Sequence, residues 1–173
     1  MNIVMIYDQI QSGMGTKDDF MLPLGGKKEA VGPAVMMQPF LSRIGARVTA
    51  CLYCGNGCFM ENPETVCKKL SMMVQKLKPD AVICGPAFNY TEYARMCAAV
   101  AEQIQKDCTI PVFAAMSEEN EETLQAYREK IAIVRMPKKG GAGLNDSLKN
   151  MCRLAEAVVK KEDVEKIRKE VCY

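Results

Sequence analysis

Short apolar segments alternate along the chain with longer amphipathic ones, a pattern that predicts strands and helices in turn. The strand-like segments are residues 2–7, 46–53, 80–84, 111–115 and 131–135. Helices are predicted over residues 33–44, 63–78, 90–106, 121–130 and 145–160, with a charged helical tail over about 161–173. We therefore predict a single α/β domain over residues 1–173. It is a doubly wound, parallel, five-stranded sheet, flavodoxin-like or Rossmann-like, with helices on both faces in three layers.

Right-handed crossovers leave two strand orders open, 2-1-3-4-5 and 3-2-1-4-5. In either order, ligands bind beyond the carboxyl ends of the strands, where the glycine-rich and polar segments of this sequence lie. The segment after the first strand, residues 8–31, exceeds the ~12–15 residues usual for a structureless connection. We expect it to be functional or mobile. Residues 54–62, 85–89 and 116–120 are predicted as the loops after the next three strands.

Composition excludes several classes of function. The 173 residues carry a net charge of only +2, with basic residues dispersed among acids, which argues against nucleic acid as a partner. No apolar run approaches the ~18 residues of a membrane span, and the N-terminus lacks the features of a signal peptide. Nine cysteines without such a signal indicate reduced thiols and a cytoplasmic location. The absence of histidine excludes Ser-His-Asp and Cys-His catalysis within this chain.

Three cysteines cluster after the second predicted strand, at Cys51, Cys54 and Cys58. They lack a fourth ligand, so we predict no metal site and interpret Cys51 as a core residue. Cys54 lies close before a predicted helix N-terminus, where a thiolate is stabilised. It is therefore a candidate redox or binding thiol.

Two further loops carry candidate chemistry. Gly85 permits close approach of the backbone, and Asn89 is predicted to cap the following helix and to donate to a ligand. Gly13 and Gly15 belong to a glycine-rich loop that lacks the spacing of a phosphate-binding motif. Glu119, after the fourth strand, is a candidate acid or base.

These loops resemble a known family, the selenoprotein B component of clostridial glycine, sarcosine and betaine reductases. The matching strings are Gly13-Met-Gly15, Val31-Gly32-Pro33, Cys54-Gly55-Asn56, Phe59-Met60-Glu61-Asn62, Lys78-Pro79-Asp80, Gly85-Pro86-Ala87-Phe88-Asn89 with Tyr93, Ile110-Pro111, Met116 with Glu119-Asn120, and Tyr127-Arg128. They cover nearly the whole chain, in order. The resemblance implies a component of an oxidoreductase of anaerobic amino-acid metabolism. In that family a selenocysteine attacks the carbon next to a carboxylate and displaces an amine.

The family's reactive selenocysteine belongs to a C-terminal half that this sequence does not match. The resemblance therefore implies no cofactor in this chain, and a selenocysteine or cysteine nucleophile on a partner reductase subunit within an oligomeric assembly. Glu92 stands where the family has an arginine suited to a carboxylate. This replacement favours a cationic or neutral amine over an anionic, glycine-like substrate.

We thus predict a half-domain of such a reductase, which binds a small amine or amino-acid-derived substrate. The predicted catalytic residues are Cys54, Glu61 and Glu119. The predicted substrate-binding residues are Gly13, Gly15, Gly55, Asn56, Cys58, Asn62, Gly85, Pro86, Phe88, Asn89, Tyr93 and Met116. Two alternatives stay open: a non-catalytic, flavodoxin-like module for a ligand or cofactor, and a metal or iron–sulfur carrier built on the clustered cysteines.

Overall fold

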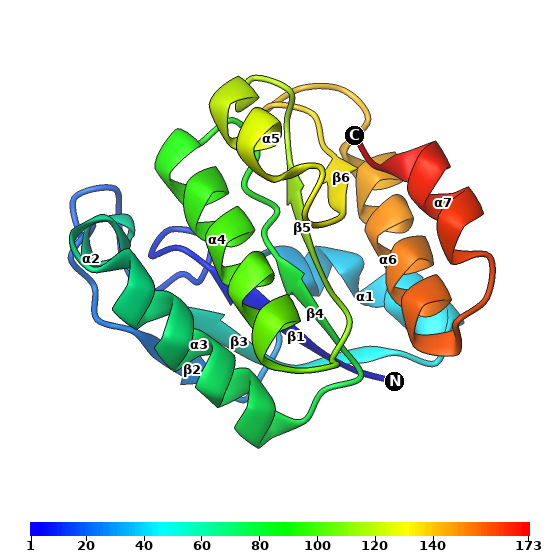
Figure 1. Cartoon of the computed structure of the whole chain (residues 1–173), viewed down its shortest axis with the longest axis horizontal. Helices are drawn as coiled ribbons and strands as arrows, with labels where there is room; N and C mark the ends of the chain where they lie inside the picture. The colour runs from blue at the N-terminus through cyan, green and yellow to red at the C-terminus, as the bar shows by residue number, and fades with distance from the viewer.

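The computed structural model describes all 173 residues and centres on one six-stranded sheet (Figure 1). Its strands are β1 (Asn2–Tyr7), β2 (Gly25–Lys27), β3 (Arg47–Tyr53), β4 (Ala81–Cys84), β5 (Val112–Met116) and β6 (Ile133–Arg135). They lie in the order β2-β3-β1-β4-β5-β6, and all neighbours are parallel except β2 and β3. Without β2, this is the order 2-1-3-4-5 of the five predicted strands, so the first of the two alternatives is confirmed.

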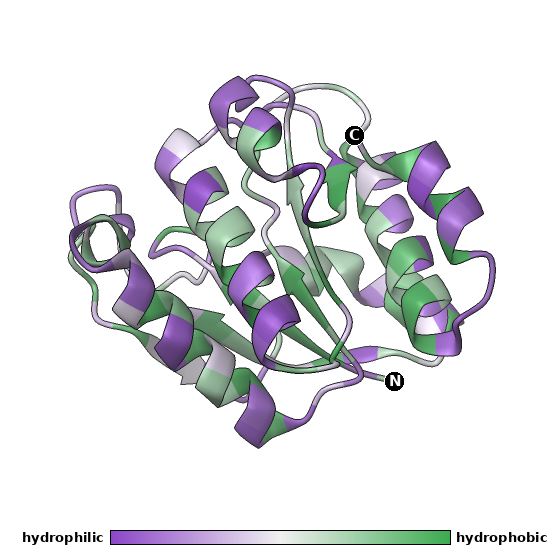
Figure 2. Ribbon diagram, in the orientation of Figure 1, coloured by the Kyte–Doolittle hydropathy of each residue, from purple (hydrophilic) through white to green (hydrophobic).

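Seven helices cover the sheet. They are α1 (Pro33–Arg43), α2 (Asn56–Glu61), α3 (Pro63–Leu77), α4 (Thr91–Asp107), α5 (Glu121–Tyr127), α6 (Leu144–Lys160) and α7 (Val164–Val171). α2, α3, α4 and α5 pack together on one face, and α1, α6 and α7 on the other. Figure 2 shows apolar strands at the centre and polar residues on the outward helix faces. The predicted three-layer α/β class is confirmed.

The central strands are apolar because both of their faces are covered. All four residues of β4 are buried, as are five of the six residues of β1. Their side chains belong to one hydrophobic core, with both faces of the sheet contributing. Apolar burial of this kind is the dominant favourable term in folding, and it gives the loops at the carboxyl ends of the strands a rigid base.

Two short elements were not predicted. β2 lies within the predicted loop over residues 8–31 and pairs with Cys51–Tyr53 at the edge of the sheet. α2 occupies most of the predicted loop over residues 54–62. Glycines in both segments give weak local propensity, so contacts with the rest of the chain decide these conformations.

The charged C-terminal segment is a helix, as predicted, and it docks on its own chain. α7 packs against α6, and Cys172 forms an antiparallel bridge with Val134 of β6. The Tyr173 hydroxyl donates to the carbonyl oxygen of Met116 at 3.3 Å. These contacts cover the outer edge of β6.

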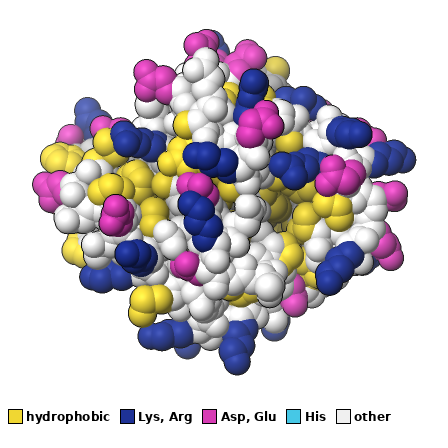
Figure 3. All heavy atoms as spheres, in the orientation of Figure 1, with side chains coloured by type: hydrophobic (Ala, Val, Ile, Leu, Met, Phe, Trp, Pro, Cys, Tyr) yellow, Lys and Arg dark blue, Asp and Glu magenta, His cyan; other side chains and the backbone are white.

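The surface mixes charges of both signs. On the face drawn in Figure 3, basic and acidic side chains are interspersed, and apolar side chains show in the hollow between α4 and α6. None of the helices combines the length and the apolar character that spanning a membrane requires.

Candidate functional site

A buried polar cluster lies where β1 ends. Asp8 is completely buried, and its Oδ1 atom accepts a hydrogen bond from the Gln11 backbone N–H at 2.7 Å. Its Oδ2 atom lies 3.5 Å from the Nδ2 donor of Asn56, and the Asn56 backbone N–H donates to Oε1 of Gln9 at 3.1 Å. The cluster therefore fixes the loop after β1 against α2. The Oδ1 atom of Asn56 has no hydrogen-bond partner.

Burial raises the pKa of Asp8, and the hydrogen bonds and the ammonium of Lys139 oppose this increase only in part. A carboxyl group whose pKa is higher in the folded than in the unfolded state binds its proton more tightly when folded. The free energy of unfolding therefore falls as pH rises through the interval from the unfolded pKa of about 3.9 to the higher folded pKa.

We expect Asp8→Asn to remove the contribution of this carboxyl group to the pH dependence of the free energy of unfolding. The variant should gain stability relative to the parent chain as pH rises from about 4 to about 7. Urea denaturation of both proteins across this range measures the difference in free energy of unfolding. A constant difference, independent of pH, would show that Asp8 titrates alike in the folded and unfolded states.

The loops after β4, β5 and β6 are tied to one another. Phe88 has a left-handed backbone with φ of 51°, and its carbonyl oxygen accepts three hydrogen bonds. Ser117 donates two, from its backbone N–H and its hydroxyl, both at 2.9 Å, and Asn120 Nδ2 donates the third at 2.6 Å. Asn89 Oδ1 accepts the Lys139 backbone N–H at 2.9 Å. These bonds hold the Phe88 side chain and the Lys139 segment in place.

A cavity of about 690 Å³ opens between the loops after β1, β4 and β6 and the start of α1. Its polar wall residues are Gln11, Ser12, Lys27 and Lys139; its apolar ones are Ile10, Val31, Pro33, Met36, Phe88 and Leu144, with Gly13, Gly32 and Gly140 between them. The only charged side chains on this wall are two lysines. The cavity is therefore suited to a small molecule that carries an anionic group beside an apolar part.

The structure brings two of the predicted site residues to the cavity wall, Gly13 and Phe88. The other predicted residues lie outside it: Gly15, Cys54, Gly55, Asn56, Cys58, Glu61, Asn62, Gly85, Pro86, Asn89, Tyr93, Met116 and Glu119. Tyr93 and Met116 are completely buried, and the Tyr93 hydroxyl donates to the Ile6 carbonyl at 3.2 Å. These two side chains belong to the hydrophobic core and do not line the cavity.

The helix cap predicted at Asn89 is wrong. Asn89 does not cap α4, because Tyr90 occupies the cap position and the Asn89 side chain binds the Lys139 backbone instead. Glu119 is exposed, and the polar surroundings formed by Ser117 and the Glu119 backbone N–H lower the pKa of its carboxyl group. Glu119 is therefore ionised near neutral pH and is a poor proton donor.

Cys54 lacks the surroundings that would stabilise the predicted thiolate. Cys54 is completely buried, and burial, together with the neighbouring Cys58, raises the pKa of its thiol to about 12. The first N–H groups of the α2 region are already bound: Gly57 donates to the Phe20 carbonyl at 2.8 Å and Gly55 to the Leu22 carbonyl at 2.9 Å. No helix N-terminus is free to stabilise a thiolate there.

Burial acts in the same way on most other thiols. It raises the pKa of Cys51, Cys54, Cys67, Cys84, Cys97, Cys152 and Cys172. None of these seven thiols is a ready nucleophile near neutral pH. The structure gathers no group of three or more His, Cys, Asp or Glu side chains in a position to hold a metal ion. The interpretation as a metal carrier on clustered cysteines thus has no support in the geometry.

Glu92 does not face the cavity. It lies with Arg95 in a separate hollow of about 380 Å³ between α2, α4 and α5. The preference for an amine that was derived from Glu92 therefore does not apply to the cavity, where the charged side chains are Lys27 and Lys139.

Sequence reasoning missed Asp8, Lys27 and Lys139. Asp8 had a usable signal, because it directly follows a buried strand at the carboxyl edge of the sheet. Lys139 lies in the loop after the fifth predicted strand. Ligands bind beyond the carboxyl ends of all the strands, so this loop was as good a candidate for the site as the loops after the other four strands. Lys27 had no local signal, since it reaches the cavity only through the pairing of β2 with β3.

Comparisons with known proteins agree on one family. The family model described as glycine/sarcosine/betaine reductase selenoprotein B matches residues 1–173. A sarcosine reductase complex component B subunit beta from Peptoclostridium acidaminophilum is 29% identical over 161 residues, which is 93% of this chain and 36% of that protein. Glycine reductase complex component B subunits gamma from Carboxydothermus hydrogenoformans and Symbiobacterium thermophilum are 32% and 31% identical, over 69% and 78% of this chain.

This chain spans about a third of the length of these relatives, with 27% and 31% of the latter two covered. No solved structure matches the chain. The family match extends over every element that builds the cavity, from β1 to α6. The chain therefore belongs to the glycine/sarcosine/betaine reductase selenoprotein B family.

Proposed function

We propose that this chain is the substrate-holding part of a glycine/sarcosine/betaine-reductase-like complex, with the cavity as its binding site. The observation that carries the proposal is a cavity at the carboxyl edge of the sheet whose only charged wall residues are Lys27 and Lys139. A small amino-acid-derived substrate has the matching chemistry: a carboxylate for the ammonium groups, and methyl or methylene groups for the apolar wall.

The nucleophile is proposed to come from outside this chain. Seven of its thiols are buried with raised pKa values, and an unionised thiol is a weak nucleophile. A selenocysteine or cysteine of a partner chain would form a bond to the carbon next to the carboxylate as the C–N bond breaks. The amine would leave with the bonding electron pair. In this scheme the cavity supplies orientation, which is a large part of catalysis for two bound reactants.

Ligand binding tests the proposal. We expect isothermal titration calorimetry to detect binding of glycine, sarcosine or betaine. It should detect no binding of methylamine or trimethylamine, which lack the carboxylate. Binding of the amines alone would reverse the proposed polarity of the site, and binding of neither group would contradict the proposal. An absorbance band of bound flavin in the purified chain would instead favour the flavodoxin-like, cofactor-binding alternative.

A further inference from the structure

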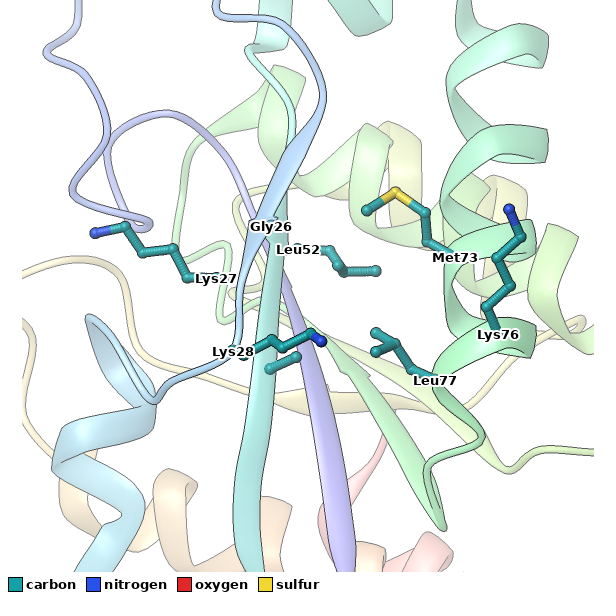
Figure 4. Close-up of a pocket in the computed structure, with 8 residues that line it drawn as sticks. Gly26, Lys27, Lys28, Leu52, Met73, Lys76 and Leu77 are labelled. Atoms are coloured by element: carbon teal, nitrogen blue, oxygen red, sulfur yellow. The ribbon is translucent and has the colours of Figure 1, made fainter.

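A second groove lies at the β2 edge of the sheet, between β2, β3 and α3, and shares only Lys27 with the cavity (Figure 4). Its volume is about 230 Å³, and its floor consists of Ala50, Leu52, Met73 and Leu77. In Figure 4 the side chains of Met73 and Leu77 converge on Leu52 from α3. Leu77 is 38% exposed. This is an apolar strip that α3 leaves partly uncovered.

The rim of this groove is positively charged. Gly26, Lys27, Lys28 and Lys76 complete its wall, and no acidic residue is part of it. Lys28 extends across the groove in Figure 4, whereas Lys27 points to the other side and forms an ion pair with Glu29 at 3.8 Å. Lys28 and Lys76 are exposed and form no ion pair within the chain. Two uncompensated cations thus flank the apolar floor.

The backbone beside the groove is also unpaired. β2 is the terminal strand of the sheet, so no strand pairs with its outer edge. β2 covers only Cys51–Tyr53 of β3, and Arg47, Val48 and Ala50 pair with β1 alone. Such an edge accepts an extended segment of another chain, in which main-chain hydrogen bonds give affinity and alternate side chains enter the pockets.

We propose that this edge is a docking site for an extended segment of a partner protein that carries acidic side chains around an apolar one. The apolar side chain would fill the floor at Leu52 and Leu77, and the acids would pair with Lys28 and Lys76. A second copy of this chain is the wrong occupant, because two such edges would bring like charges together. The narrow groove also suits one extended segment better than a broad interface.

The test is selection from a phage-displayed library of random peptides of about twelve residues on the immobilised chain. We expect the enriched peptides to combine acidic residues with a large apolar one. The best peptide, labelled with fluorescein, should bind the double variant Lys28→Glu/Lys76→Glu at least about tenfold more weakly in fluorescence anisotropy. Hydrogen exchange should show that the peptide protects the backbone amides of residues 25–28.

The matched control is Lys166→Glu/Lys169→Glu on α7, which changes the net charge equally at two exposed lysines that also lack ion pairs. It should bind the peptide as the parent chain does. Lys28→Ala/Lys76→Ala serves if charge reversal disturbs folding, as judged by circular dichroism. Peptides without acidic residues, equal binding to the Lys28/Lys76 and control variants, or failure to enrich any peptide would each overturn the proposal.

Discussion

Substitution of Gly85 by alanine is expected to destabilise the fold by about 3 kcal/mol or more. Gly85 has φ of +112°, a conformation that side-chain-bearing residues rarely adopt. A Cβ atom would lie 2.7 Å from the carbonyl oxygen of Ala115 and 2.9 Å from the backbone nitrogen of Ala87. These two atoms form a hydrogen bond of 2.8 Å with each other. The methyl group would therefore strain the backbone and break a buried bond between β5 and the cavity loop.

Gly45→Ala is the matched control, because Gly45 has φ of +64° but a Cβ atom there would meet nothing within 4 Å. It carries the conformational cost without the collision, about 1–2 kcal/mol. Urea denaturation at neutral pH gives the free energy of unfolding of both variants. Equal losses would show that the loop of Gly85 yields to the added methyl group, and that it is less rigid than its hydrogen bonds indicate.

Reversal of the charge at Lys139 is expected to weaken binding of a carboxylate ligand by at least about tenfold, which corresponds to about 1.4 kcal/mol. This expectation depends on the proposed function. Lys139 is an exposed wall residue of the cavity, and only its backbone N–H holds Asn89. Lys139→Glu should therefore leave the Asn89 bond intact and cost no more than about 1–2 kcal/mol of stability, from the lost attraction to Asp8 and the lost contact with the Tyr90 ring. Calorimetric titration with sarcosine measures the loss of affinity.

Lys138→Glu supplies the control in the same loop. Lys138 is exposed but is not part of the cavity wall, so the same change in net charge should leave affinity nearly unchanged. Lys139→Met separates loss of the cation from repulsion by the introduced acid. If the two glutamate variants weakened binding equally, the effect would be one of overall charge, and Lys139 would have no direct role.

Much of the fold follows from local properties of the sequence. The alternation of apolar and amphipathic segments predicted five strands and their intervening helices, because an element buried on both faces differs in composition from one buried on a single face. Proline at the start of α1 and α3 located two helix ends. The motifs around Gly13, Gly85 and Phe88 indicated the family. They also indicated that the ligand site lies at the carboxyl edge of the sheet.

The site itself depended on tertiary contacts. β2 and α2 form because chain segments distant in sequence supply their hydrogen bonds: β3 pairs with β2, and the carbonyls of Phe20 and Leu22 bind the N–H groups at the start of α2. Gly55 is required there because a Cβ atom would lie 2.3 Å from the Phe20 oxygen. Neither requirement is visible in the local sequence.

The charge and the reactivity of individual side chains also depend on tertiary contacts. Cys54 has the local context of a reactive thiol, yet its burial raises its pKa, because an apolar surrounding disfavours the charged form. Asp8 and Lys139 are far apart in the sequence and interact because two strand ends meet at one edge. The sequence alone therefore determined the family and every element except β2 and α2. The structure decided which side chains meet and which of them carry charge, since both depend on contacts between residues distant in the chain.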